Sequence, residues 1–387
     1  MKIMRRYGRI ALILGVLMVV ATGCMPRGGV TNPGWTVVAV EDNQVYAALA
    51  TGQVVCLDAA ASGSALWSYP ADGGGAAGGV GCGNIIPTGG GDAPRDEPLD
   101  AVYGIPVLTD DLVLVSAYDG GLYALDRETG QMAWDYAVPK AIIGGVTVYD
   151  GVAYFGSSDH NVYALDLETQ KTVWSLPFAT ENWIWGAPAV DAEHVYVGSM
   201  DHWVYAVDRV TGDLAWKRDL GASIPGNLAL DDGTLFAGAI DRRLHAIDTA
   251  DGSTIWQSDV LGGWVWGQPA VVDGYVYFTS LDGGVHSADV ASGTPRWPAV
   301  KLDGAVRAGP AVLRDMLIVG TEEGSVYRVD MATGDSRQSS GASAAILSRP
   351  AVDDGIVYVG TTDAKVQALN FAREVDPFVW TYPQGKK

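Results

Sequence analysis

Short apolar segments of about four residues, separated by tight-turn signals, alternate along most of the chain. One stretch is typical, with segments at Pro269–Val272, Tyr275–Phe278, Gly284–Ser287 and Thr294–Trp297. The Asp273-Gly274 pair separates the first two, and glycine readily adopts the positive φ that a tight hairpin requires. The pattern therefore predicts an all-β chain of short antiparallel strands.

A repeated motif, Ala-x-Asp-x-x-Thr-Gly-x-x-x-Trp, divides these strands into units. It is plain from Asp126 to Trp134 and from Asp208 to Trp216, and from Asp126 onward its aspartate position recurs every 40 to 42 residues. Five copies keep an eight-residue spacing between aspartate and tryptophan. Three copies are degenerate, with Asp58 nine residues before Trp67, Asp330 followed at that spacing by Gln338, and Asn370 followed by Phe378.

Four strands in a period near 41 residues, repeated eight times, predict an eight-bladed β-propeller of four-stranded antiparallel blades. A β-sandwich does not repeat eightfold, and a solenoid coil is shorter. The first interval, from Asp58 to Asp126, is longer because residues 71–102 contain a Gly-rich insertion. We therefore expect the propeller to span residues 35–383, followed by a tail at 384–387.

The motif resembles the tryptophan-docking repeat of PQQ-like (pyrroloquinoline-quinone repeat) β-propellers. That family includes quinoprotein dehydrogenases and the BamB-type lipoproteins of the outer-membrane β-barrel assembly complex. The resemblance covers residues 35–383 and implies that the repeated tryptophans pack between blades. It thus assigns a structural role to Trp134, Trp174, Trp216, Trp256 and Trp297.

The N-terminus has the organisation of a bacterial lipoprotein signal. Four basic residues precede an apolar run from Ile10 to Ala21, and Ala21-Thr22-Gly23-Cys24 follows. The run has about twelve residues, whereas a stable transmembrane helix needs roughly 20. We expect a signal peptide at 1–23, a lipid on Cys24 and a tether at 24–34; an ordinary cleaved signal is the alternative. The protein would be exported and lipid-anchored, on the periplasmic face of an outer membrane or the outer face of the cytoplasmic membrane.

Charge and cysteine content narrow the possible partners. Without residues 1–23 the chain has 21 Lys and Arg against 45 Asp and Glu, a net charge of -24. Such a surface repels nucleic acid.

Two cysteines, Cys56 and Cys82, remain after Cys24. Their spacing leaves open whether they form a disulfide in an oxidising compartment.

Aligning the repeats places one residue of each blade at a channel mouth, three positions before the Pro-Ala-Val segment. This ring is Trp35, Tyr103, Ile143, Trp185, Pro225, Trp266, Arg307 and Leu347. Trp183 and Trp264 lie two residues earlier in blades four and six, and Asn227, Gln268 and Arg349 add polar groups nearby. Aromatic residues suit protein-binding hot spots and ligand platforms. Aromatic residues could equally cap the core where the channel opens, and the sequence leaves both interpretations open.

A second ring of carboxylates lies seven residues before each aspartate marker, in the second hairpin turn of the blades. Aspartate favours such turns locally, and the same ring could form a charged docking rim. Its members are Asp119, Asp159, Asp201, Asp241, Asp282, Glu323 and Asp363.

The resemblance to quinoprotein dehydrogenases implies a calcium ion, a catalytic aspartate and often a disulfide between adjacent cysteines. This chain has no adjacent cysteines, and its histidines are not clustered as metal ligands. We therefore expect no catalysis, metal or resident cofactor, and predict a membrane-anchored binding scaffold for a cell-envelope protein. The alternatives are a dehydrogenase or sensor that binds pyrroloquinoline quinone with calcium, and a carbohydrate-binding propeller with a small ligand.

Overall fold

The computed structural model describes residues 34–60, 62–71, 97–373 and 376–384. The predicted signal peptide, Cys24, Cys82 and most of the predicted insertion lie outside these residues. Within them, no helix has the length and apolar character needed to cross a bilayer.

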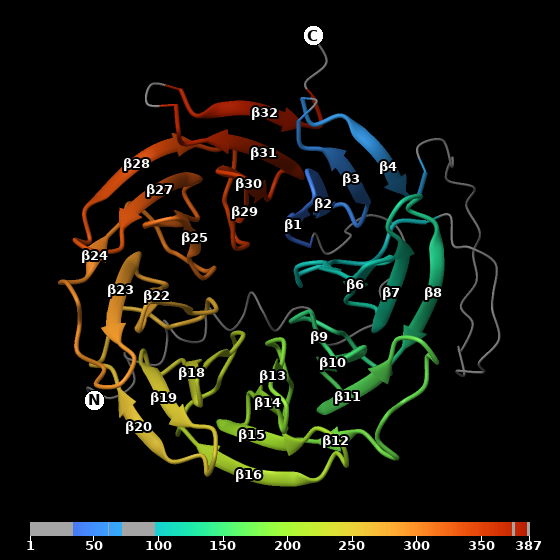
Figure 1. The fold of residues 1–387 in the computed structure, drawn as a ribbon, viewed down its shortest axis with the longest axis vertical. Helices are drawn as coiled ribbons and strands as arrows, with labels where there is room; N and C mark the ends of the chain where they lie inside the picture. Colours follow the sequence, from blue (N-terminus) through green and yellow to red (C-terminus); the bar gives the residue numbers. More distant parts are fainter. Residues whose placement is uncertain (1–33, 61, 72–96, 374–375, 385–387) are drawn as a thin grey trace, which may run out of the picture. The chain divides into compact units, whose positions relative to one another are not determined.

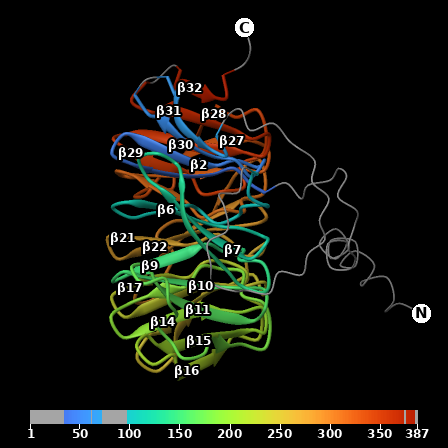
Figure 2. The same cartoon turned by 90° about the vertical axis from the view of Figure 1, so that its right-hand side faces the viewer.

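The prediction of an eight-bladed propeller is confirmed. Eight antiparallel sheets, each of four consecutive strands, follow one another around a ring (Figure 1). Figure 2 shows the same blades from the edge of the ring. Blades one to four contain β1 (Val37–Glu41), β2 (Gln44–Ala48), β3 (Val54–Asp58), β4 (Ala65–Tyr69); β5 (Val107–Leu108), β6 (Leu112–Ser116), β7 (Gly121–Asp126), β8 (Met132–Ala137); β9 (Val146–Tyr149), β10 (Val152–Gly156), β11 (Asn161–Asp166), β12 (Phe178–Ala179); β13 (Ala189–Val190), β14 (His194–Gly198), β15 (Trp203–Asp208) and β16 (Leu214–Asp219). Blades five to eight contain β17 (Ala229–Asp231), β18 (Thr234–Gly238), β19 (Leu244–Asp248), β20 (Thr254–Gln257); β21 (Ala270–Val272), β22 (Tyr275–Ser280), β23 (Gly284–Asp289), β24 (Val300–Lys301); β25 (Ala311–Leu313), β26 (Met316–Gly320), β27 (Ser325–Asp330), β28 (Ser336–Gly341); β29 (Ala351–Asp353), β30 (Ile356–Thr361), β31 (Lys365–Asn370) and β32 (Phe378–Tyr382).

The outer strand of blade six is shorter and lies later than the sequence pattern predicts. The prediction of a strand at Thr294–Trp297 is wrong, because β24 contains only Val300 and Lys301. Pro295 and Pro298 flank Trp297 and have no backbone N–H to donate to β23, so this segment cannot form a continuous ladder.

The core lies between blades rather than inside a single sheet. The second and third strands of each blade are almost wholly buried, as in β10 and β11, because both of their faces pack against neighbouring blades. Leu114 of blade two and Phe155 of blade three, for example, belong to one buried cluster. Outer strands such as β16 alternate between exposed and half-buried residues, as expected for strands with one face in water.

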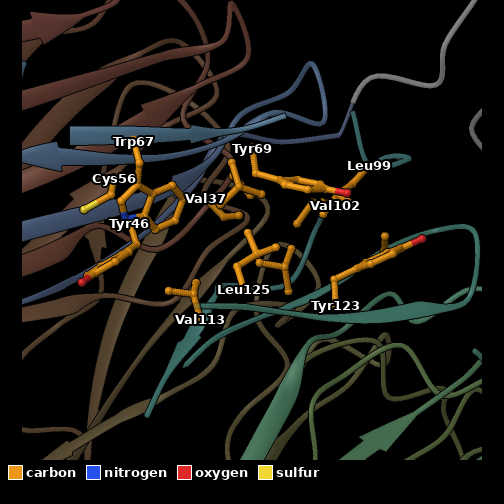
Figure 3. Packing of buried hydrophobic residues seen from close by; sticks show 14 residues of the cluster. Val37, Tyr46, Cys56, Trp67, Tyr69, Leu99, Val102, Val113, Tyr123 and Leu125 are labelled. Carbon is orange, nitrogen blue, oxygen red and sulfur yellow. The ribbon is translucent and has the colours of Figure 1, made fainter. Parts of the chain in front are cut away.

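Tryptophans of the outer region dock six of the eight blades onto the next. At six junctions the indole Nε1 donates to the carbonyl that follows the aspartate marker of the next blade, at 2.7 to 3.1 Å. In the same six blades a Tyr or Phe of the second strand lies 5.8 to 6.3 Å from that indole. Figure 3 shows one such junction, where Trp67 and Tyr46 of blade one pack with Val113 and Leu125 of blade two. The six donors are Trp67, Trp174, Trp216, Trp256, Trp297 and Trp380.

Two of these tryptophans differ from the sequence assignment. Trp67 and Trp380 belong to repeats interpreted as degenerate, and Trp380, rather than Phe378, docks blade eight. Trp134 is half-buried, and blade three has Gln170 with φ of +58° where six of the blades have the motif glycine. Spacing alone therefore identified too few docking residues.

The ring closes by simple abutment of the first and last blades. All four strands of blade one come from the N-terminal end of the described chain, and all four strands of blade eight come from its C-terminal end. The Ser348 hydroxyl donates to the carbonyl of Thr36 at 2.8 Å, and Trp380 donates to Ala59. No strand is exchanged between these two sheets.

Candidate functional site

The loops that enter the innermost strands form the candidate site, on the face that also carries the second hairpin turns. A repeated hydrogen bond fixes each loop to the turn of its own blade. The N–H of Met200 donates to the Trp183 carbonyl, and the N–H of Leu281 donates to that of Trp264, both at 2.9 Å. Tyr118 and Ala101 are paired in the same way, so residues near 101, assigned to the insertion from the sequence, form a regular mouth loop.

Three predicted mouth tryptophans form one cluster. The rings of Trp183 and Trp185 are stacked, with centroids 6.1 Å apart and planes 23° apart. Trp185 of blade four also contacts Trp266 of blade six, at 5.7 Å and 38°. The intervening blade five places the smaller Pro225 at the corresponding position. Aromatic contacts in this distance range are stabilising.

Arg307 extends this cluster across the mouth. Its guanidinium carbon lies 5.1 Å from the ring centroid of Trp266 and 5.7 Å from that of Trp35. Glu322 orients it, with its Oε1 atom 2.9 Å from Nη2 of Arg307. The guanidinium therefore joins two indoles by cation–π contacts.

Two tyrosines complete the cluster. Trp35 meets Tyr103 edge-on at 5.2 Å, and Tyr103 lies 6.1 Å from Tyr118. We refer to the whole set as the aromatic mouth: Trp35, Tyr103, Tyr118, Trp183, Trp185, Trp266 and Arg307. Sequence alignment of the repeats missed Tyr118 and Glu322, because both lie in second hairpin turns rather than at the ring position.

Part of the aromatic mouth is accessible, and part has unused hydrogen-bonding capacity. Trp183 is 38% exposed, and Trp264, on the same face, is 36% exposed. The Nε1 atom of Trp185 is buried and has no hydrogen-bond partner among the described residues. A buried unpaired donor costs about 1–3 kcal/mol, so an acceptor that reached it would be bound favourably.

The predicted polar residues brace the mouth. Oδ1 of Asn227 accepts the N–H of Ala187 at 2.8 Å, and Nε2 of Gln268 donates to the Leu228 carbonyl at 3.0 Å. These bonds tie blades four, five and six together directly behind Trp185 and Trp266. Both amides also line a channel cavity of about 170 Å³. Burial lowers the pKa of the Arg349 guanidinium in blade eight.

The carboxylate ring supports the second hairpin turns. Oδ1 of Asp119 accepts the N–H of Gly121 at 2.9 Å, and Oδ2 accepts the Tyr123 hydroxyl at 2.6 Å. Asp159 with Tyr163 and Asp201 with Tyr205 repeat this arrangement. Asp241 accepts a hydrogen bond from His245 instead of a tyrosine. Asp282 forms an ion pair with Lys301, and Asp363 forms one with Lys365. Glu323 is exposed. Burial, together with the bond to Asp159, raises the pKa of Tyr163.

The residues that line the channel cavity bear on whether it could hold a quinone with calcium. Its cavity is lined by Gly, Ala, Pro, Val, Ile and Thr together with the two amides, without a carboxylate. Within the described ranges, no group of three or more His, Cys, Asp or Glu side chains could hold a metal ion. Calcium requires several oxygen ligands.

Two other arrangements resemble reactive sites only superficially. Ser280 Oγ lies 2.9 Å from Nε2 of His286, yet Ser280 is fully buried and Asp282 accepts from its hydroxyl rather than from the imidazole. This is not the geometry of a catalytic triad. Cys56 is buried in β3, and burial raises the pKa of its thiol to about 12. Its disulfide with Cys82 stays a prediction.

Comparisons with known proteins agree with the repeat architecture. The sequence model for the outer membrane protein assembly factor BamB family matches residues 26–143, 87–199, 139–224, 200–305 and 282–384. The BamB of Francisella tularensis subsp. tularensis (strain SCHU S4 / Schu 4) is 32% identical over 85 residues, which are 22% of this chain and 18% of that protein. A quinoprotein ethanol dehydrogenase of Pseudomonas aeruginosa is 30% identical over 96 residues, covering 22% of this chain and 15% of that enzyme. The chain thus matches less than a fifth of the length of either relative.

Solved structures show the same fold. BamB from Moraxella catarrhalis superposes with a TM-score of 0.67 at 20% identity, covering 86% of this chain and 95% of that chain. The computationally designed protein Ika8 superposes with a TM-score of 0.73 at 18% identity, covering 87% of this chain and 96% of its own.

Proposed function

Because the chain belongs to the outer membrane protein assembly factor BamB family, we propose that it is a non-catalytic scaffold that docks an envelope protein through the aromatic mouth. The relatives named BamB support a role in outer-membrane protein assembly. In this proposal the chain is exported, carries a lipid on Cys24 and works at the periplasmic face of an outer membrane.

One observation carries the proposal: Arg307 joins Trp35 and Trp266 within a continuous cluster that extends to the exposed Trp183. Trp, Tyr and Arg are enriched among the few residues that dominate the binding energy of protein interfaces. The amide bonds of Asn227 and Gln268 hold the loops behind this cluster, so the surface is pre-organised for binding.

Affinity capture of the full-length lipoprotein from its native membrane tests this function. We expect one stoichiometric envelope protein with the wild type and its loss with the double variant Trp185→Ala, Trp266→Ala. The matched control, Leu176→Ala with Val210→Ala, removes two side chains that are 76% and 71% exposed outside the mouth. Equal capture by both double variants would contradict the proposal.

The proposal also assigns no resident cofactor to the scaffold. Its test is titration with pyrroloquinoline quinone and calcium, followed by tryptophan fluorescence and melting temperature. Saturable quenching with a rise in melting temperature would instead favour a quinone-dependent dehydrogenase or sensor.

A further inference from the structure

The junction between blades seven and eight departs from the docking pattern. Six of the other seven junctions are filled by an aromatic residue of the second strand and the indole beside it, such as Tyr277 and Trp297, with ring centroids 6.3 Å apart. Blade seven has Ile318 in the second strand, and Gln338 at the motif spacing of the tryptophan. This junction therefore lacks the two large rings that fill those six.

Arg328 replaces the hydrogen bond of the missing indole. Its Nη1 atom donates to the Phe371 carbonyl at 3.2 Å, and Phe371 follows the marker position of blade eight, as Met331 does for Trp297. The guanidinium carbon lies 5.1 Å from the centroid of the Phe371 ring. An arginine thus holds the two blades together beside an aromatic wall.

A pocket of about 250 Å³ opens at this junction. Its walls come from the first hairpins of both blades and the end of β31, and include Leu313, Arg314, Met316, Arg328, Asn370 and Phe371. A dry apolar cavity of about 150 Å³ is sufficient to bind benzene. The space is therefore large enough for a small aromatic ring with a polar substituent.

Two arginines line this pocket, although the chain has a net charge of -20. Among the described residues, neither Arg314 nor Arg328 lies within 4.0 Å of a carboxylate oxygen. The arginines at two other junctions are paired, with Arg127 2.7 Å from Glu41 and Arg209 3.7 Å from Asp150. Uncompensated guanidinium groups at a cavity favour a carboxylate, which they bind with charge-assisted hydrogen bonds.

Two exposed carboxylates limit the negative charge that a ligand of this pocket can carry. Asp315 and Asp354 lie on the hairpin turns at the rim of the cavity. They disfavour multiply charged anions such as phosphate, because like charges in the same site repel. A ligand with a single negative charge is favoured.

From these observations we propose that the junction of blades seven and eight binds a small aromatic monocarboxylate. The ring occupies the pocket and packs on Phe371. The carboxylate pairs with the guanidinium groups of Arg328 and Arg314. The site is separate from the aromatic mouth and does not depend on the proposed scaffold function.

Calorimetric titration of the full-length protein with indole-3-acetate tests this site. Indole-3-acetamide keeps the ring but lacks the charge, acetate lacks the ring, and inorganic phosphate carries more charge. We expect saturable binding of indole-3-acetate and at least about ten-fold weaker binding of the other three, since one charge-assisted bond of about 1.4 kcal/mol corresponds to ten-fold. Equal affinity for the acid and the amide, or no saturable binding of the acid, would overturn the proposal.

Variants then locate the binding. Arg314 has φ of +57° in its turn, a conformation that asparagine tolerates, so Arg314→Asn removes the charge without backbone strain and is expected to weaken binding about ten-fold. Arg242→Asn is the matched control, because Arg242 has φ of +69° in an exposed turn of blade five; its affinity should equal that of the wild type. Phe371→Leu keeps an apolar side chain but removes the ring on which the ligand packs, and should weaken binding several-fold. Equal weakening by both arginine variants, or wild-type affinity in a folded Phe371→Leu protein, would contradict the site.

Discussion

The indole of Trp380 lies against Gly63, and its Nε1 atom donates to the carbonyl of Ala59 at 3.0 Å. This contact joins the last blade to the first and gives the ring its closure. A β-carbon on Gly63 would lie 2.4 Å from Cε3 of Trp380. The motif glycine therefore serves close approach as well as turn conformation.

Substitution of Gly63 by alanine separates these two roles. We expect Gly63→Ala to lower the free energy of unfolding by about 2–4 kcal/mol, because the indole must move and the residue keeps φ of +67°. Gly151→Ala is the control, since Gly151 has φ of +73° with open space around its β-carbon position; its cost should be about 1 kcal/mol. Denaturant unfolding measures both, and equal losses would show that close packing at the closure has no energetic weight.

Removing the amide of Asn227 should loosen the mouth locally. In Asn227→Ala the buried N–H of Ala187 loses its acceptor, at a cost of about 1–3 kcal/mol, and the loop that carries Trp185 loses its tie to blade five. Hydrogen exchange of a peptide covering residues 183–190 should become faster. Asn161→Ala is the control, because that amide bonds within its own turn; unchanged exchange in Asn227→Ala would contradict the bracing role.

His286 should make the protein less stable in mild acid. Burial lowers its pKa from 6.5 to about 4, with Asp282 raising it and Lys301 lowering it further. As pH falls from 7 to 4.5, the unfolded chain takes up a proton that the folded protein excludes, so stability falls by about 2 kcal/mol from this group. Exposed carboxylates with a lowered pKa, such as Asp126, also stabilise the folded protein. That stabilisation is lost only when the pH falls below 3.8, the ordinary pKa of an aspartate.

The variant His286→Phe keeps an aromatic ring beside Phe278 and removes the titrating group. Its denaturation midpoint should fall less between pH 7 and pH 4.5 than that of the wild type. Parallel curves for the two proteins would assign the acid sensitivity to other groups.

The repeat spacing was sufficient to predict the blades, because alternating strands and turn signals are local properties of the sequence. It left Trp67 out of the docking set, because that copy is one residue longer, and in blade eight a fixed spacing selected Phe378 instead of Trp380. In blade six the outer strand begins later than predicted, because Pro295 and Pro298 have no backbone N–H to donate to the neighbouring strand. In these cases the chain keeps the contact between blades while changing the turn that supplies it.

The candidate site was less predictable, because its contacts cross blades. Repeat alignment placed Trp185 and Trp266 on one ring, but their contact depends on how the closed ring brings blades four and six together over Pro225. The hydrogen bonds that Asn227 and Gln268 form with the backbone of neighbouring blades likewise cannot be predicted from the repeat spacing. The cavity at Phe371 arises from residues in two different repeats.

Site-specific photocrosslinking at Trp183 tests whether a protein docks at the aromatic mouth. A photoreactive side chain replaces Trp183, which is 38% exposed at the mouth, or Leu176, which is 76% exposed outside it, and the full-length protein is irradiated in its native cells. We expect one dominant protein adduct from position 183 that disappears in the Trp185→Ala, Trp266→Ala background, and none from position 176. An adduct from position 176 with none from position 183 would contradict docking at the aromatic mouth.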